Sequence, residues 1–232
     1  MSSMHEYDIV WPTNISENLK ARLIEIAIPI DSIEQFKLNP DYWSVEGLYY
    51  IQSGLMTVGY TAEDLNTTIS AILGPHDWIG ANTLFSEKEL LFRSFTLTPV
   101  KMLFFPRAKM EILVSQEPEI YKLLFHILRH ISPHWIKSAL VCMHERRRRL
   151  AFSILMIFTK QNEYEGTTNP ELLVSQQQLS SIVGISRPRV NETLKEFEEL
   201  GFISVQRGRI TIKEVDGLKE CLEDLFVLFN LG

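Results

Sequence analysis

The sequence predicts an α+β protein built from three successive parts. Short apolar runs broken by turn residues fill 28–106 and predict an all-β domain. A regular apolar pattern over 118–145 predicts one long helix, and residues 174–212 combine two short helices with a hairpin. The predicted boundaries are 1–116 for the β domain, 117–147 for a long dimerisation helix and hinge, and 148–232 for the C-terminal domain.

Composition limits the class of protein. The chain has 232 residues, 45% of them hydrophobic, and no apolar run approaches the roughly 20 residues that cross a bilayer. Residues 1–12 lack a basic-then-apolar signal, so we expect a cytoplasmic protein. Cys142 and Cys221 show no metal-ligand spacing and are expected to be free thiols.

The N-terminal part begins with a predicted helix at 15–27. Ser16 can cap this helix, and apolar residues recur along it every three or four positions. Three segments then each predict two short strands separated by turn residues, which indicates an all-β sandwich or barrel. These segments are 48–60, turning at Ser53-Gly54, 67–80, turning at Gly74-Pro75, and 92–106, turning near Thr98-Pro99.

The long helix is predicted from Pro118 to about Glu145, with apolar residues alternating four and three positions apart. Such a helix between two domains usually packs against a second copy of itself; packing within the chain is the alternative. Pro133 should kink the helix, or restart it with Ser132 as a cap, because proline removes one backbone hydrogen bond. The predicted dimer seam consists of Leu124, Leu128, Ile131, Trp135, Ser138 and Cys142.

Three further expectations concern residues beside this helix. Cys142 on the seam is expected to be an inert thiol, with a disulfide across the two-fold axis as the alternative. Arg146–Arg149 are expected to form the hinge before a helix over 150–159. A final amphipathic helix is expected over 217–229, with Leu218, Leu222, Leu225 and Phe229 facing inward.

Residues 174–212 predict a helix-turn-helix followed by a wing. The first helix covers 176–182, and Gly184 after it tolerates the positive φ of a tight turn. Ser186 is a predicted N-cap for the second helix, with Pro188 in its first turn. The buried stripe of that helix is Val190, Leu194 and Phe197, and β runs at 202–205 and 210–213 flank the turn 206–209.

This layout is typical of proteins that place one helix in the major groove of DNA. The alternative is a small helical bundle whose arginines are merely solvated. The formal net charge of −6 does not oppose DNA binding, because the distribution of charge decides the local field. Basic residues gather at 146–149, on the second helix and on the wing, so we expect moderate and salt-sensitive affinity.

A jelly-roll β domain, a long central helix and a winged helix-turn-helix, in this order, resemble the Crp/Fnr family of bacterial transcription regulators. The resemblance covers nearly the whole chain, and the helix-turn-helix is its most specific part. Five segments carry it: LYYIQSG at 48–54, IG to LF at 79–85, Arg93-Ser94, RRLAF at 148–152 and QLSSIVGISRPRV at 178–190.

The resemblance also implies a place for an effector, between the jelly roll and the central helix. Cyclic-AMP-binding members use a Glu after the IG glycine, an Arg-Ser pair and a Thr-Ser pair. Here the Arg-Ser pair is present, and its arginine could hold a phosphate. Ala81 replaces the Glu, and Trp135 and Ile136 replace the Thr-Ser pair, so we expect an unknown effector other than cyclic AMP. The candidate pocket residues are Ala81, Asn82, Arg93, Ser94, Trp135 and Ile136.

The sequence gives little support for a metal site, a cofactor or an enzymatic activity. His126, His130 and His134 share one stripe of the long helix, and His76 lies in a turn. Imidazoles with this spacing can bind metal, but no cysteine or carboxylate in the sequence completes an evident site, so polar surface histidines are expected. N-terminal cysteines for an iron–sulfur cluster are absent, as are phosphate loops and nucleophile elbows, so we expect neither a cofactor nor an enzyme.

The resulting hypothesis is a homodimeric, sequence-specific transcription regulator that binds double-stranded DNA at an inverted repeat. RNA polymerase is a further candidate partner. Alternatives are a cyclic-nucleotide-responsive activator and a small-molecule-binding module that acts through protein contacts. By resemblance, Arg187, Pro188 and Glu192 occupy base-reading positions. The full set of candidate DNA-binding residues is Ser175, Gln176, Gln177, Ser186, Arg187, Pro188, Arg189, Asn191, Glu192, Lys195, Arg207 and Arg209.

Overall fold

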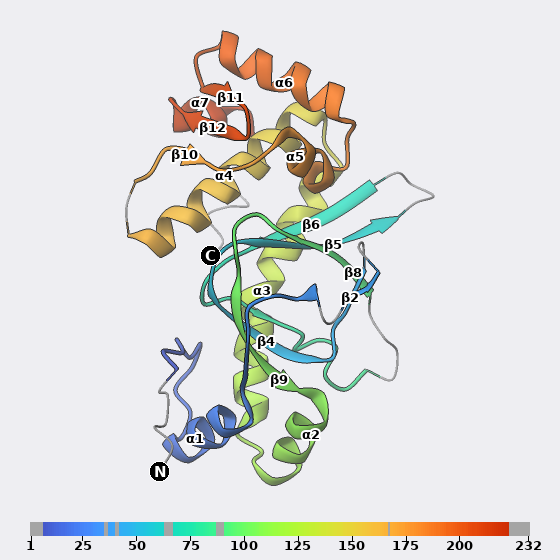
Figure 1. The fold of residues 1–232 in the computed structure, drawn as a ribbon, viewed down its shortest axis with the longest axis vertical. Helices are drawn as coiled ribbons and strands as arrows, with labels where there is room; N and C mark the ends of the chain where they lie inside the picture. Colours follow the sequence, from blue (N-terminus) through green and yellow to red (C-terminus); the bar gives the residue numbers. More distant parts are fainter. Residues whose placement is uncertain are drawn as a thin grey trace. The chain divides into compact units, whose positions relative to one another are not determined.

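The computed structural model, drawn in Figure 1, describes residues 7–34, 37–39, 42–62, 67–86, 91–166 and 168–222. The chain divides into two compact units, and each is discontinuous in sequence. Unit 1 contains residues 1–54, 74–92 and 99–132, and unit 2 contains 55–73, 93–98 and 133–232. Antiparallel sheets occupy the N-terminal region and helices dominate the C-terminal region, which is the predicted α+β class.

Unit 1 is built on a four-stranded antiparallel sheet with the order β1-β9-β4-β7. Tyr49 of β4 lies opposite Phe104 of β9, and Tyr50 lies opposite Trp78 of β7. This register turns Leu48 and Tyr50 into the same core as Phe105, because side chains alternate along a strand. The strands of this sheet are β1 Ile28–Ile30, β4 Gly47–Ser53, β7 Trp78–Ile79 and β9 Lys101–Pro106. Strands β2 (Lys37–Asn39) and β3 (Tyr42–Ser44) form a further antiparallel pair.

Helices α1 (Glu17–Ile26) and α2 (Arg107–Gln116) complete the core of unit 1 with the first part of α3 (Ile120–Cys142). The Ser16 hydroxyl accepts from the Leu19 amide, which confirms the predicted cap of α1. Helix α2 was not predicted, although Met110, Leu113 and Val114 form its buried stripe. Its short apolar pattern follows directly on a buried strand, and the sequence offers no capping side chain between the two.

Unit 2 contains the hairpin β5 (Met56–Ala62)–β6 (Thr67–Leu73), which pairs through β5 with residues 93–96 of β8 (Leu91–Thr96). The strands predicted within 48–60 and 92–106 are confirmed, but each pair separates into different sheets. β4 and β9 pair with each other in one sheet, whereas β5 and β8 pair in the other. The turns at Ser53-Gly54 and Thr98-Pro99 therefore carry the chain between sheets and do not close hairpins.

The C-terminal part of unit 2 is a three-stranded sheet, with the order β10-β12-β11, surrounded by four helices. Leu150, Leu179 and Phe197 from three of these helices are fully buried in one core. The elements are α4 Arg146–Glu165, β10 Glu171–Leu172, α5 Gln176–Val183, α6 Arg187–Glu199, β11 Ile203–Gln206, β12 Arg209–Ile212 and α7 Val215–Glu220.

The hinge prediction is wrong for Arg146–Arg149, which form the first turn of α4. The break lies instead at residues 143–145, between α3 and α4. Two of the residues expected to face inward from the final helix, Leu225 and Phe229, lie outside the described residues. Leu218 and Leu222 are buried as expected.

Helix α3 continues through Pro133, so the predicted restart at this proline is wrong. Ser132 does not act as an N-cap; its hydroxyl donates to the Leu128 carbonyl one turn earlier at 2.5 Å. Two residues of the predicted seam, Leu124 and Ser138, are buried within the chain itself. The helix also has an outward apolar stripe, which consists of Tyr121, Phe125 and Ile136 and is 56–63% exposed.

The turn glycine of the helix-turn-helix gives a stability test. Gly184 has φ +62°, and a Cβ there would lie 2.9 Å from Cβ of Thr68. Gly201 ends α6 with φ +78° but has open space around it. We expect Gly184→Ala to lower the free energy of unfolding by about 2 kcal/mol or more and the control Gly201→Ala by about 1 kcal/mol. Denaturant unfolding followed by circular dichroism measures both, and equal losses would contradict the crowding at Gly184.

Candidate nucleic-acid interface

Helix α5 is fixed at both ends by local interactions. Ser175 and Gln178 form a capping box: the Ser175 hydroxyl accepts from the Gln178 amide, and the Gln178 side chain accepts from the Ser175 amide. At the other end, Gly184 adopts the left-handed conformation, and its amide donates to the Ser180 carbonyl at 2.9 Å. These two ends define the turn that leads into α6.

Helix α6 has one buried side and one exposed side. Val190, Leu194 and Phe197 are at most 1% exposed, which confirms the predicted stripe. Thr193, also buried, donates from its hydroxyl to the Arg189 carbonyl at 3.1 Å. The exposed side chains include Arg187, Pro188, Arg189 and Lys195.

The two arginines at the start of α6 are available to an anionic partner. Pro188 lies in the first turn, where its missing N–H costs no helical hydrogen bond. Ser186 has the backbone conformation of an N-cap, but its side chain makes no capping hydrogen bond. Among the described residues, neither Arg187 nor Arg189 has an acceptor for its guanidinium group. A helix end with two solvated guanidinium groups suits contact with phosphates and guanine edges.

The wing is the hairpin β11–β12, closed by Gly208 with φ +73°. Arg207 is exposed beside this turn. The Val205 amide donates to a Glu198 carboxylate oxygen at 2.6 Å, which ties the wing to α6. Arg209 forms an ion pair with Glu171 at 2.9 Å, so this predicted phosphate contact already has a partner in the chain.

Other predicted DNA-binding residues are also engaged within the domain. The Gln176 amide nitrogen donates to the Asn191 side-chain oxygen at 3.1 Å, which links α5 to α6. Glu192 pairs with Arg146 at 2.8 Å. Gln177 is exposed on α5. The sequence predicts a hinge at Arg146 and gives no sign of this pairing, because the contact joins residues 46 positions apart.

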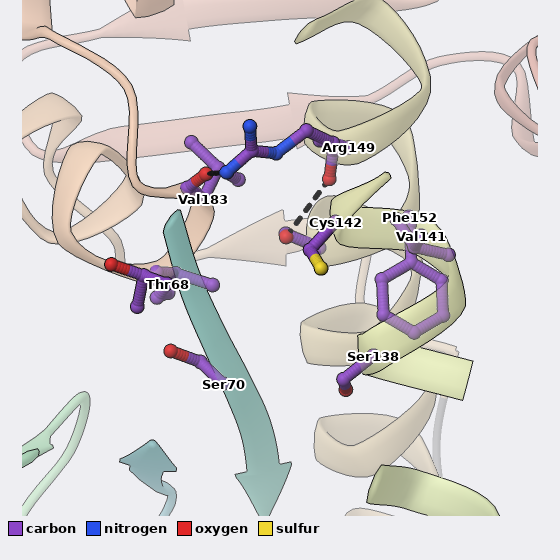
Figure 2. A pocket seen from close by; sticks show the side chains of 10 residues that line it. Thr68, Ser70, Ser138, Val141, Cys142, Arg149, Phe152 and Val183 are labelled. Carbon is purple, nitrogen blue, oxygen red and sulfur yellow. Dashed lines mark hydrogen bonds between the residues drawn. The ribbon is translucent and has the colours of Figure 1, made fainter. Parts of the chain in front are cut away.

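Arg149 connects α4 to the end of α5. Its side chain donates to the Val183 carbonyl, as Figure 2 shows, and burial lowers the pKa of the guanidinium from its usual value. A small recess beside it in unit 2 is lined by β6, α3, α4 and α5. Its polar lining side chains are Thr68, Ser70, Ser138, Cys142, Arg149 and Ser153.

The candidate effector residues fall in both units. In unit 1, Ala81 is 9% exposed and Asn82 is exposed. In unit 2, Ser94 is buried, and its hydroxyl has no hydrogen-bond partner among the described residues. Arg93, beside it, is exposed.

Two large side chains occupy the remaining candidate effector positions on α3. The Trp135 ring lies 5.6 Å from that of Tyr60 on β5, measured between centroids. Ile136 is 59% exposed and belongs to the outward stripe. Neither side chain carries a hydroxyl group.

Two of the histidines have polar partners within unit 1. Tyr50 Oη lies 2.7 Å from His76 Nδ1, and this hydroxyl also accepts from the Val10 amide. His130 Nε2 lies 3.2 Å from an oxygen of the buried Asp77 carboxylate. No carboxylate for the histidine stripe is evident in the sequence. Asp77 provides one for His130, because the fold brings together residues 53 positions apart.

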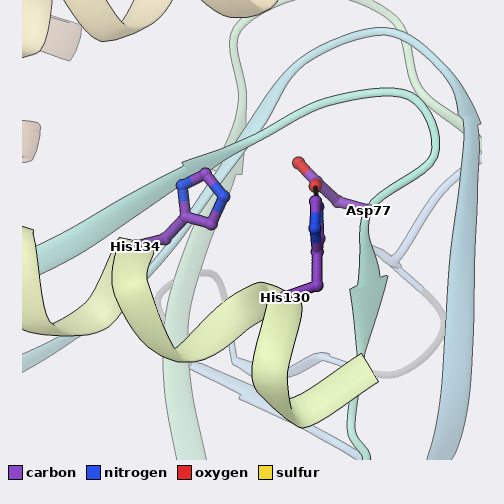
Figure 3. A group of neighbouring side chains, drawn as sticks. All are labelled: Asp77, His130 and His134. Atoms are coloured by element: carbon purple, nitrogen blue, oxygen red, sulfur yellow. Dashed lines mark hydrogen bonds and ion pairs between the residues drawn. The ribbon is translucent and has the colours of Figure 1, made fainter. Parts of the chain in front are cut away.

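Asp77 and His130 place a carboxylate beside an imidazole in unit 1, which is a pairing of potential metal ligands. Figure 3 shows the Asp77 carboxylate facing the His130 ring, with His134 one turn further along α3. Carboxylate and imidazole groups are ligands that zinc accepts. The second Asp77 oxygen accepts from the Gly74 amide at 2.8 Å, so the carboxylate also stabilises the preceding turn.

Family comparisons agree with this geometry. Residues 44–117 match the cyclic nucleotide-binding domain, and residues 148–221 match the Crp-like helix-turn-helix domain. The chain belongs to the Crp/Fnr family of transcription regulators. It is therefore a DNA-binding regulator, with a cyclic-nucleotide-binding-type domain preceding its helix-turn-helix.

Individual relatives support this assignment. The CRP-like cAMP-activated global transcriptional regulator of Mycobacterium tuberculosis is 25% identical over 173 residues, covering 74% of this chain and 77% of that protein. The CRP-like protein Clp of Xanthomonas oryzae is 24% identical over 177 residues, covering 71% of this chain and 74% of that protein.

Solved structures share the fold of this Crp/Fnr protein. A Crp/Fnr regulator from Eubacterium rectale has a TM-score of 0.66 at 15% identity, covering 90% of this chain and 96% of that one. The c-di-GMP-responsive regulator CLP of Xanthomonas campestris has a TM-score of 0.65 at 18% identity, covering 85% and 99%. Across the described residues, no helix combines the length and apolar character of a membrane span.

Proposed function

We propose that this Crp/Fnr protein acts in the cytoplasm as a homodimer that binds inverted-repeat DNA sites and answers to an effector other than cyclic AMP. It acts by binding DNA and not as an enzyme. The observation that carries the proposal is the exposed start of α6, where Arg187 and Arg189 are solvated on a helix whose other side is buried. A rigid helix with guanidinium groups at its N-terminal end can enter the major groove.

The arginines of α6 and of the wing should affect DNA binding differently. Arg187 can pair with guanine O6 and N7, so we expect Arg187→Ala to reduce affinity by about 1–3 kcal/mol and to relax one base position per half-site. We expect Arg207→Ala on the wing to weaken all sequences alike and to reduce the salt slope by about one. Selection from a random DNA library, followed by titrations at two salt concentrations, separates these effects.

Symmetry provides a second readout from the same selection. Two copies of α6 related by a two-fold axis require half-sites about one helical turn, ~10 base pairs, apart. Unchanged binding by both variants would show that α6 and the wing do not contact DNA. A selected site without two-fold symmetry would rule out the symmetric dimer on DNA.

The outward stripe of α3 supports the homodimer. Tyr121, Phe125 and Ile136 lie 4 and 11 positions apart, so they fall on one side of the helix. Large apolar side chains that are more than half exposed in a row are typical of an interface. Dimerisation is typical of the family, and this stripe replaces the seam predicted from the heptad pattern.

A single charge on this stripe should separate the dimer. We expect Ile136→Glu to give a monomer, because the interface would bury two unpaired carboxylates at a cost of several kcal/mol. Ile112→Glu on α2 is a matched control, because Ile112 is 58% exposed and Ile136 is 59% exposed. Sedimentation velocity should show the monomer for the first variant only. A dimer that survives Ile136→Glu would exclude this stripe.

The effector proposal depends on which chemical groups the candidate effector residues lack. Ala81 offers no carboxylate to a ribose, and Trp135 and Ile136 offer no hydroxyl to a base. Arg93 and the buried Ser94 hydroxyl remain as polar groups that a different ligand could use. A cyclic-nucleotide-responsive activator is the second candidate function, because residues 44–117 match the cyclic nucleotide-binding domain.

Calorimetry distinguishes these two candidates. Each missing hydrogen bond to a buried ligand group costs roughly 1–3 kcal/mol, so two or three losses weaken cyclic AMP binding by about two to six orders of magnitude. We therefore expect no measurable heat at micromolar cyclic AMP or cyclic GMP. Submicromolar binding of either nucleotide would contradict the proposal and would show that other residues replace the missing groups.

A further inference from the structure

Helix α6 carries an electrostatic conflict for a DNA-reading helix. It has three basic side chains but four carboxylates, at Glu192, Glu196, Glu198 and Glu199. Carboxylates that enter a groove lined by phosphates are repelled by like charge. Glu198 is used within the fold, where it accepts from the Val205 amide. The position of Glu192 matters most, because it lies one turn beyond Pro188 on the exposed side.

Arg146, from the first turn of α4, pairs with two of these carboxylates at once. Its Nη1 donates to Glu192 Oε2 at 2.8 Å, and its Nη2 donates to Glu196 Oε1 at 3.1 Å. The two glutamates are four residues apart and so lie on one face of α6. One planar guanidinium therefore bridges two acidic side chains on successive turns.

The ion pairs of Arg146 with Glu192 and Glu196 are not explained by a contribution to the stability of the fold. The Arg146 side chain is 40% exposed, and those of Glu192 and Glu196 are 59% and 43% exposed. Exposed ion pairs of this kind contribute little to folding. Their effect is instead to neutralise the two carboxylates and to restrict where the Glu192 carboxylate can reach.

We propose that Arg146 is a positioning residue that sets the base preference of α6 by holding the Glu192 and Glu196 carboxylates within the domain. This inference rests on the proposed function, that α6 reads DNA. A glutamate carboxylate can accept from the cytosine amino group, so an unpaired Glu192 would add a preference for cytosine. While Arg146 engages it, Glu192 does not contribute to base readout, and α6 reads DNA through its basic side chains.

The first test compares base preferences by selection from a random library. We expect Arg146→Gln to gain a preference of about fivefold for cytosine at one position per half-site, because Glu192 is released. We expect the double variant Arg146→Gln/Glu192→Ala to lose this preference again, because alanine offers no acceptor to the cytosine amino group. A base preference of Arg146→Gln identical to that of the wild type would overturn the proposal.

The second test is a double-mutant cycle on affinity for the wild-type site. We expect Arg146→Gln to weaken binding by about tenfold, because two uncompensated carboxylates then face phosphates. In a Glu192→Gln/Glu196→Gln background the same change should have an effect of less than about twofold. A tenfold loss that persists in that background would show that Arg146 contacts a phosphate directly, which would overturn the proposal.

Two controls complete the design. Asp216→Asn removes the carboxylate of another exposed ion pair, that with Lys219 on α7, and should leave the base preference and affinity unchanged. Circular dichroism of each variant checks that it is folded. We expect Arg146→Gln to fold, because the Arg146 side chain is 40% exposed. Absence of DNA binding by the wild-type protein would refute the proposed function itself. A wild-type protein that binds DNA but shows no coupling between Arg146 and Glu192 or Glu196 would refute only the role of Arg146.

Discussion

The burial of Val190, Leu194 and Phe197 determines which side chains of α6 face solvent and can contact DNA. These three side chains fix the rotation of α6 about its own axis, because they are at most 1% exposed in the core of unit 2. Once that rotation is set, Arg187, Arg189 and Lys195 must point to solvent. The cap of α5, the left-handed Gly184 and the bond between Val205 and Glu198 then hold the helix at its ends.

Local ion pairs, rather than the net charge of the chain, determine which charged groups of α6 and the wing remain available. The chain has a formal charge of −6, yet the start of α6 shows two solvated guanidinium groups. Arg146 compensates two of the acidic side chains on the same helix, and Glu171 engages Arg209 on the wing. The set of basic groups left available to DNA is therefore smaller and more localised than the sequence indicates.

Helices and turns that depend on local sequence patterns were predicted correctly. The capped α1, the helix-turn-helix and the wing follow from caps, turn glycines and periodic apolar residues, and the structure confirms them. Contacts between distant residues were not predictable in this way. Arg146 pairs with Glu192, and Asp77 with His130, because tertiary packing brings them together. The heptad pattern of α3 could not distinguish residues that the chain itself buries, such as Leu124 and Ser138, from residues that it leaves exposed.

Chemical interference can show whether α6 reads DNA from the major groove. Dimethyl sulfate methylates guanine N7 in the major groove and adenine N3 in the minor groove. We expect guanine N7 methylation to block binding in two clusters about one helical turn, ~10 base pairs, apart. Interference confined to adenine N3, or to a single cluster, would contradict it.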